Sequence, residues 1–139
     1  MATLIVETRP EQCPLEFGGD SSALVWLLSF AAVEQFGSQH ELSLAATVLR
    51  HKFKVRLRTL LRFAAANDDD PEELERAWQP ALPLAETVTA VRAALASGDR
   101  QLDANSKDFP ELPPLLADLE GMCRWAAKYD AEVRLTYQL

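Results

Sequence analysis

The stretch LRHKFKVRLRTLLRFAA, residues 49–65, determines how much of the chain is interpreted as helix. Within it, Arg50, Lys54, Arg58 and Arg62 recur at every fourth position. Residues with this spacing lie one above another on a helix, so the four cations would form a ridge about 18 Å long. Like charges at this spacing repel, at a total cost of about 1 kcal/mol for the ridge. The spacing therefore predicts a basic helical ridge that faces an anionic group.

An apolar stripe extends the same predicted helix over residues 41–66. Residues 52–58 also alternate between cations and apolar side chains, as a half-buried strand does. The length of the stripe favours the helix, and a basic face survives either assignment. In the strand alternative that face comprises Lys52, Lys54, Arg56 and Arg58. In the helix the stripe comprises Leu42, Ala46, Leu49, Phe53, Leu57, Leu60 and Ala64.

The part of the chain before residue 41 predicts one strand and one helix. Residues 3–8, TLIVET, are rich in β-branched side chains and are followed by prolines, which indicates a short strand. Residues 21–36 are apolar on nearly every side of a helix, which indicates a central position, and Gly37 is a natural stop. The apolar run from Ala23 to Val33 is too short to span a bilayer.

The part after residue 66 predicts two further helices, a last helix and a strand. Asp70-Pro71-Glu72-Glu73 has the pattern of a helix start, with a short helix continuing to Trp78. Residues 84–97 carry a helical apolar stripe, and a last helix begins at Pro114. Residues 99–114 are polar and lack periodicity, which predicts a mobile surface loop.

Residues 132–139 alternate as a strand does, and this pattern completes the predicted fold. Val133, Leu135, Tyr137 and Leu139 are expected to bury one face while Arg134, Thr136 and Gln138 face outward. Two strands alone are marginal in water, so the terminal pair is expected to lie on helices, and its free edge could recruit a third strand from another chain. The sequence predicts a single α+β domain over residues 1–139, predominantly helical, with four to five helices and a small strand pair made by the two termini.

Composition limits the kinds of partner that the protein can have. The chain of 139 residues is 48% hydrophobic and 25% charged, as globular proteins are. Its net charge is -7: residues 1–66 carry seven Lys/Arg and six Asp/Glu, while residues 67–139 carry seven and fifteen. An acidic protein is disfavoured as a non-specific binder of nucleic acid or membrane surfaces.

Groups able to support metal or catalytic chemistry are sparse. Cys13 and Cys123 are far apart, and Cys123 is expected in the core as a reduced thiol of a cytoplasmic protein. His40 and His51 have no nucleophile near them in sequence, so no catalytic residue, metal site or cofactor is predicted. Acidic residues 68–75 are better explained by helix capping than by a calcium site, because the EF-hand spacing is absent.

These observations favour a non-catalytic protein–protein interaction module, such as an adaptor, an accessory subunit or an inhibitor-like partner. Its expected partner is a protein with an acidic patch, or a second copy joined through the terminal strands. In one alternative, Glu72, Glu73 and Glu75 neutralise the ridge within the chain. In a second, the protein is a nucleic-acid-binding accessory protein in which Phe53 or Phe63 stacks on bases. In a third, it is an enzyme or a ligand carrier with a pocket between helices. The candidate partner-binding residues are Arg50, Lys54, Arg58, Arg62, Trp78 and Trp125.

Overall fold

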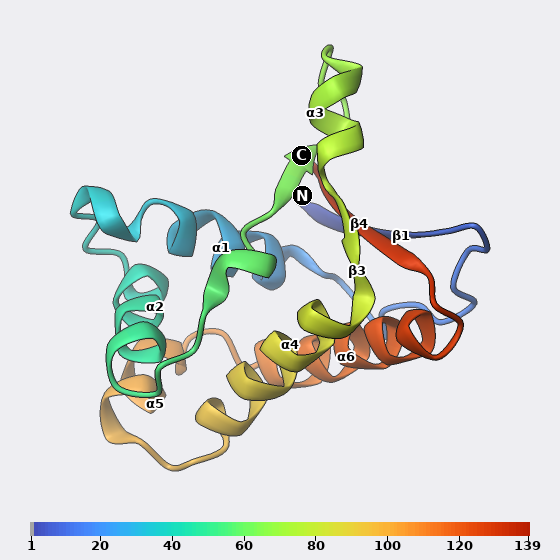
Figure 1. Cartoon of the computed structure of the whole chain (residues 1–139). Helices are drawn as coiled ribbons and strands as arrows, with labels where there is room; N and C mark the ends of the chain where they lie inside the picture. Colours follow the sequence, from blue (N-terminus) through green and yellow to red (C-terminus); the bar gives the residue numbers. More distant parts are fainter. Residues whose placement is uncertain (1) are drawn as a thin grey trace.

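The computed structural model describes residues 2–139. These residues form six α-helices, two short 3-10 helices and a four-stranded sheet (Figure 1). Helices predominate and both ends of the chain contribute strands, so the predicted α+β class with a helical majority is confirmed. The helices outnumber the four to five expected because residues 100–106 are helical.

The sheet is built around β4 (Glu132–Gln138). β1 (Thr3–Arg9) pairs with β4 antiparallel along one edge, which confirms the predicted pairing of the terminal strands. Two short strands share the other edge: β2 (Phe63–Ala65) runs parallel to β4, and β3 (Trp78–Pro80) runs antiparallel. Both edges of β4 are therefore occupied by strands of the same chain. Recruitment of a further strand from another chain stays a prediction.

The burial of β4 follows the predicted alternation in its first half only. Val133 and Leu135 are fully buried, as expected. Leu139 is 79% exposed and Thr136 is only 2% exposed, so the prediction for these two residues is wrong. Thr136 lies opposite Ala64 of β2, with β1 on its other side. Side chains on the neighbouring strands thus shield a position that would face water in an isolated hairpin.

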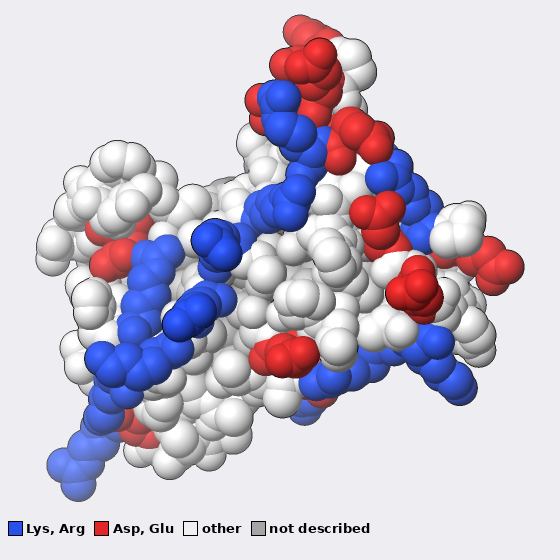
Figure 2. All heavy atoms as spheres, viewed as in Figure 1, with Lys and Arg blue, Asp and Glu red and all other residues white. Residues whose placement is uncertain are grey.

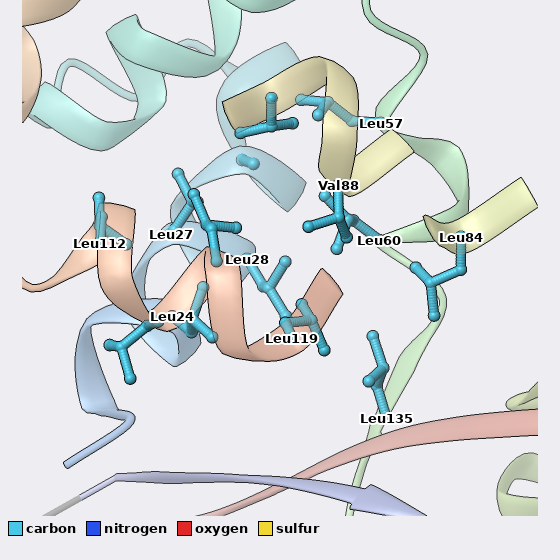
Figure 3. Packing of buried hydrophobic residues seen from close by; sticks show 14 of the residues in the cluster. Leu24, Leu27, Leu28, Leu57, Leu60, Leu84, Val88, Leu112, Leu119 and Leu135 are labelled. Atoms are coloured by element: carbon cyan, nitrogen blue, oxygen red, sulfur yellow. The ribbon is translucent and has the colours of Figure 1, made fainter. Parts of the chain in front are cut away.

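Four helices enclose the core beside the sheet. The central one, α1 (Ser22–Ala32), packs against β1, α2 (Glu41–His51) and α6 (Leu112–Lys128). α4 (Ala81–Leu95) lies along α6. Fully or almost fully buried side chains from helices and sheet meet in one cluster (Figure 3), which includes Leu24, Leu28, Leu84, Leu119 and Leu135.

The predicted helix over residues 41–66 is wrong beyond His51, where α2 ends. Lys54 has a backbone φ of 57°, the left-handed conformation that commonly ends a helix. The amide of Val55 then donates a hydrogen bond of 2.9 Å to the carbonyl of Leu49. The chain therefore turns away from the helix axis directly after α2.

The alternative strand over residues 52–58 is also wrong, because this segment is irregular up to the 3-10 helix η2 (Leu57–Thr59). η2 packs against α4, and Leu57 and Leu60 are both buried. Leu57 and Leu60 of the predicted stripe thus reach the core, but they do so because η2 packs against α4 and not because a helix continues.

The predicted surface loop over residues 99–114 is wrong, because α5 (Arg100–Ser106) occupies much of it. Asp99 caps this helix by accepting a hydrogen bond of 2.9 Å from the amide of Leu102. Leu102 is fully buried, and α5 packs against α2. One buried side chain gives no periodicity, so the apolar pattern does not reveal the helix.

α3 (Pro71–Arg76) stands away from the body of the molecule, between β2 and β3 (Figure 1). The carboxylate of Asp70 accepts a hydrogen bond of 2.9 Å from the amide of Glu72, which confirms the predicted capping. The helix ends at Arg76 rather than at Trp78, which begins β3.

Candidate functional site

Four arginines line a concave surface formed by the segment that leads from α2 to β2. The concavity has a volume of about 790 Å³. Figure 2 shows lysine and arginine side chains in a diagonal row across this face, from α2 to the base of α3. Apolar side chains of Val55, Leu57 and Leu61 also line it. We call this surface the arginine groove and define it by Arg50, Arg56, Arg58 and Arg62.

The arginine groove contains three of the four predicted ridge residues: Arg50, Arg58 and Arg62. The fourth, Lys54, is exposed at the turn after α2 and does not line the concavity. Arg56, which belonged to the strand alternative, takes part instead. A basic face is therefore present, but an irregular segment forms it rather than one face of a helix.

Arg50 is neutralised within the chain. It forms an ion pair with Glu34, which lies in the 3-10 helix η1 (Glu34–Phe36). Glu34 also accepts a hydrogen bond of 2.7 Å from the hydroxyl of Thr47. This hydrogen bond is the largest cause of the lowered pKa of Glu34, and the nearby Arg50 charge lowers it further, against the opposing effect of burial. The α2 end of the groove therefore carries a compensated charge.

Lys52, beside the groove, is neutralised as well. Its ammonium group pairs with Asp99, the residue that caps α5. The hydrogen bond from Lys52 and the one from the amide of Leu102 lower the pKa of Asp99. This ion pair joins the turn after α2 to the start of α5.

The acidic residues of α3 do not neutralise the groove. Glu72 and Glu73 pair with Arg76 of the same helix. Glu75 pairs with Arg9 of β1. The hypothesis that these three glutamates compensate the predicted ridge is therefore wrong.

Three arginines of the groove remain without an acidic partner. Within residues 2–139, Arg56, Arg58 and Arg62 have no carboxylate within 4.0 Å. All three are exposed, and Arg62 donates a hydrogen bond of 3.0 Å from its Nε to the carbonyl of Arg76. Their guanidinium groups are thus available to an external anion.

A second hollow, of about 460 Å³, adjoins the groove and shares Arg58 and Arg62 with it. Sequence analysis missed this hollow because most of its other residues come from β3 and the start of α4. A three-residue strand gives no periodic signal. We call it the Gln79 pocket; its remaining lining residues are Thr59, Gln79, Pro80 and Pro83.

The two predicted tryptophan anchors lie away from the groove. The ring centroid of Trp78 is 4.3 Å from the guanidinium carbon of Arg9 and 4.7 Å from that of Arg134. Trp125 packs beside Tyr129, with ring centroids 4.9 Å apart. Both indoles are half-buried, and neither lines the arginine groove. Their role in partner binding stays a prediction.

The thiols and imidazoles lie outside the groove too. Cys123 is fully buried in the core as predicted, and burial raises the pKa of its thiol to about 12. Cys13 is also buried and free. His40 caps α2 by accepting a hydrogen bond of 3.1 Å from the amide of Leu42. In the described part of the chain, no three His, Cys, Asp or Glu side chains gather into a group that would hold a metal ion.

Comparisons with protein-family models, curated proteins and solved structures found no match for this chain. None of the helices described in residues 2–139 has both the length and the apolar character needed to cross a bilayer. The arginine groove, with its three unpaired guanidinium groups, is the candidate site that the geometry supports.

Proposed function

We propose that this protein is a non-catalytic protein–protein interaction module and that its arginine groove binds an acidic segment of a partner protein. One observation carries the proposal: Arg56, Arg58 and Arg62 line a single concavity, and none has a carboxylate partner within residues 2–139. Guanidinium groups held on one surface repel one another, and a bound anionic segment relieves this repulsion. An adaptor, an accessory subunit and an inhibitor-like protein all require such a surface.

The lining of the groove favours a polypeptide as its ligand. Arginine presents forked N–H donors that match the two oxygens of a carboxylate. Between the arginines, the groove offers the apolar side chains of Val55, Leu57 and Leu61. A surface with a cationic rim and an apolar floor suits a segment that carries both carboxylates and apolar side chains.

Nucleic acid is the alternative ligand, and two observations weigh against it. The net charge of -7 repels a polyanion at long range. Phe53 and Phe63 are partly buried against the core, and Phe63 packs edge-on against Tyr137 with ring centroids 5.7 Å apart. These rings are therefore poorly placed to stack on bases, which single-strand binding commonly uses.

Self-association through the terminal strands is less favoured than partner binding at the groove. The outer edge of β1 already has partners from its own chain. The amide of Leu4 donates to Ser21 Oγ at 2.9 Å, and that of Thr8 donates to Gln12 Oε1 at 3.1 Å. Gln12 Nε2 donates to the carbonyl of Val6 at 3.1 Å. These contacts occupy groups that an added strand would need.

The proposed compartment is the cytoplasm. Cys13 and Cys123 are both free and buried. Free cysteines are common in reducing compartments, where thiols are kept reduced.

Affinity purification with two charge-matched double variants tests the proposed function. Arg56→Glu with Arg58→Glu reverses the groove. Arg100→Glu with Lys107→Glu changes the net charge equally, at two exposed residues that do not line the groove. Quantitative mass spectrometry should show an acidic partner that co-purifies with the wild type and the control, and at least tenfold less of it with the groove variant.

Equal recovery of every co-purifying protein by all three forms would overturn the proposed function. Each purification is repeated after nuclease treatment. A partner lost on nuclease treatment, together with a mobility shift of bare RNA or DNA that weakens steeply with salt, would replace the proposal with the nucleic-acid alternative.

A further inference from the structure

The Gln79 pocket combines two of the three arginines that lack an acidic partner with a buried glutamine. Arg58 and Arg62 are exposed and belong to both the pocket and the arginine groove. Pro80 and Pro83 supply apolar walls that carry no side-chain donor or acceptor. Gln79 lines the same pocket, although only 2% of its surface is exposed. A ligand that enters between the arginines therefore meets a buried amide group.

The backbone and one hydrogen bond fix the position of the Gln79 side chain. Gln79 lies in β3, paired in the register with Val133 of β4. Its Nε2 donates a hydrogen bond of 3.0 Å to the carbonyl of Thr59. Because a carbonyl only accepts, this contact sets which end of the carboxamide is nitrogen.

The same carboxamide keeps unused hydrogen-bonding capacity. Within residues 2–139, Gln79 Oε1 accepts no hydrogen bond, and the single bond of Nε2 leaves its second N–H free. Two side-chain atoms of the described residues are fully buried without a hydrogen-bond partner, and Gln79 Oε1 is not one of them. This unpaired oxygen therefore keeps some exposed surface. The free acceptor is thus consistent with an atom that faces the pocket it lines.

An acceptor and a donor side by side complement the N–H and C=O of one extended residue better than they complement a simple anion. A carboxylate accepts hydrogen bonds only, so it would use the free N–H but place its negative oxygens near Gln79 Oε1. A residue in extended conformation turns its own N–H and C=O to the same side, so its N–H can donate to Gln79 Oε1 while its carbonyl accepts from Gln79 Nε2. The arginines at the pocket mouth then have acidic side chains as their ligands.

We propose that Gln79 recognises the main-chain N–H and C=O of one extended residue in an acidic segment of a partner polypeptide, while Arg58 and Arg62 hold carboxylates of the same segment. This inference rests on the proposed function of the groove and adds a recognition mode to it. The apolar walls limit competing water, so the amide contact gives the segment a fixed register. Specificity then depends on the backbone as well as on charge.

A peptide selected on the protein itself provides the probe. A random heptapeptide library displayed on phage is panned against the wild-type protein, and the enriched peptide is synthesised with a fluorescent label. We expect an acidic consensus whose binding weakens at least tenfold with Arg58→Gln and less than twofold with Arg100→Gln. Each backbone amide of the peptide is then methylated in turn, and affinities for wild type and Gln79→Leu are measured by fluorescence polarisation.

The expected result is a coupling between one peptide amide and Gln79. Methylation at that position weakens binding to the wild type at least tenfold, but changes binding to Gln79→Leu less than threefold. Methylation effects that are equal in the two proteins at every position would overturn the inference while leaving the proposed function intact. An enriched peptide without acidic residues, or one insensitive to Arg58→Gln, would overturn the proposed function instead, as would a library that yields no binder.

A second measurement guards against a variant that fails to fold, because Gln79→Leu leaves the carbonyl of Thr59 without its donor. In the wild-type protein, the side-chain amide resonances of Gln79 are assigned by triple-resonance NMR and followed during titration. They should shift on addition of the peptide and stay in place on addition of glutarate at the same carboxylate concentration. Resonances that do not respond to the peptide, or respond equally to glutarate, would overturn the inference.

Discussion

Arg134 of β4 and Glu7 of β1 face each other across the strand pair and form a two-point ion pair. The distances are 3.1 Å from Nε to Oε1 and 2.8 Å from Nη2 to Oε2. Arg134 also donates to the carbonyl of Leu74 at 3.4 Å and lies against the ring of Trp78. This one side chain therefore links the sheet to the end of α3.

Replacing Arg134 with Met should destabilise the fold. The side chain of Arg134 is 20% exposed and that of Glu7 is 35% exposed, so solvent screens the pair only in part. Loss of the guanidinium leaves Glu7 without its partner, and we expect the free energy of unfolding to fall by about 1–2 kcal/mol. Urea denaturation measures this change. Arg124→Met, at an exposed arginine of α6, is the control and should change stability by less than about 0.5 kcal/mol; equal effects of the two variants would contradict the prediction.

Replacing Lys54 with Gly should stabilise the fold. Lys54 has a φ of 57°, a conformation that costs about 1–2 kcal/mol for a residue with a side chain. Glycine avoids that cost but has more freedom in the unfolded chain, worth about 0.5–1 kcal/mol. The expected net gain is about 0.5–1 kcal/mol in urea denaturation. Arg56→Gly, at an extended position with a φ of -90°, should lower stability instead, and the prediction fails if both variants act in the same direction.

The residue at position 54 also explains why the end of α2 could not be predicted. A helix end in the left-handed conformation is usually marked by glycine or asparagine, and here a lysine occupies the place. The apolar stripe continues past it because Leu57 and Leu60 are buried by a different route. The apolar stripe therefore predicts correctly that Leu57 and Leu60 are buried, but not the path that the backbone takes to bury them.

In the sheet and in the groove, too, the sequence predicts some features and leaves others hidden. Strands β1 and β4 have seven residues each, long enough to show β-branched content in β1 and an alternating sequence in β4, whereas β2 and β3 have three residues each. Charge identified Arg50, Arg58 and Arg62 as one face, since charged residues lie outside whichever backbone they follow. The pairing of Arg50 with Glu34 depends on how η1 packs against α2, which no local spacing in the sequence records.

The stability of the protein should fall in acid partly through Glu34. Its pKa lies below its ordinary value of 4.5 in the folded protein. As pH falls, the unfolded state therefore takes up the proton first, so the contribution of Glu34 is full above about pH 5 and is lost as pH falls through the folded pKa. Glu34→Gln should cost about 1 kcal/mol at pH 7, and the difference from wild type should shrink below pH 4.5.

Urea denaturation at several pH values between 7 and 3 measures this difference. The control is Glu86→Gln, at an exposed residue of α4 that forms no ion pair within residues 2–139. It should remain within about 0.5 kcal/mol of the wild type at pH 7. A difference between wild type and Glu34→Gln that stays constant down to pH 3 would show that the carboxylate charge is not its source.

At the end of the chain, residues 136–138 belong to the sheet, whereas Leu139 does not. Thr136, Tyr137 and Gln138 pair with β1 on one side, and the first two also pair with β2 on the other. Leu139 lies beyond β4 and is 79% exposed. Tolerance to truncation should follow this pairing and burial rather than distance from the terminus.

Deleting residues 136–139 should therefore abolish cooperative folding, whereas deleting Leu139 alone should change stability by less than about 0.5 kcal/mol. The longer deletion removes the strand partners of Leu4, which is 3% exposed, and of Ala64 in β2. β1 and β2 then stay joined to β4 only through its residues 132–135, although β4 is the strand that lies between them. Thermal unfolding followed by circular dichroism compares the two truncations with the full chain. A chain ending at Leu135 that melts cooperatively near the wild-type temperature would mean that the helices alone hold the fold, and that β4 merely rests on them.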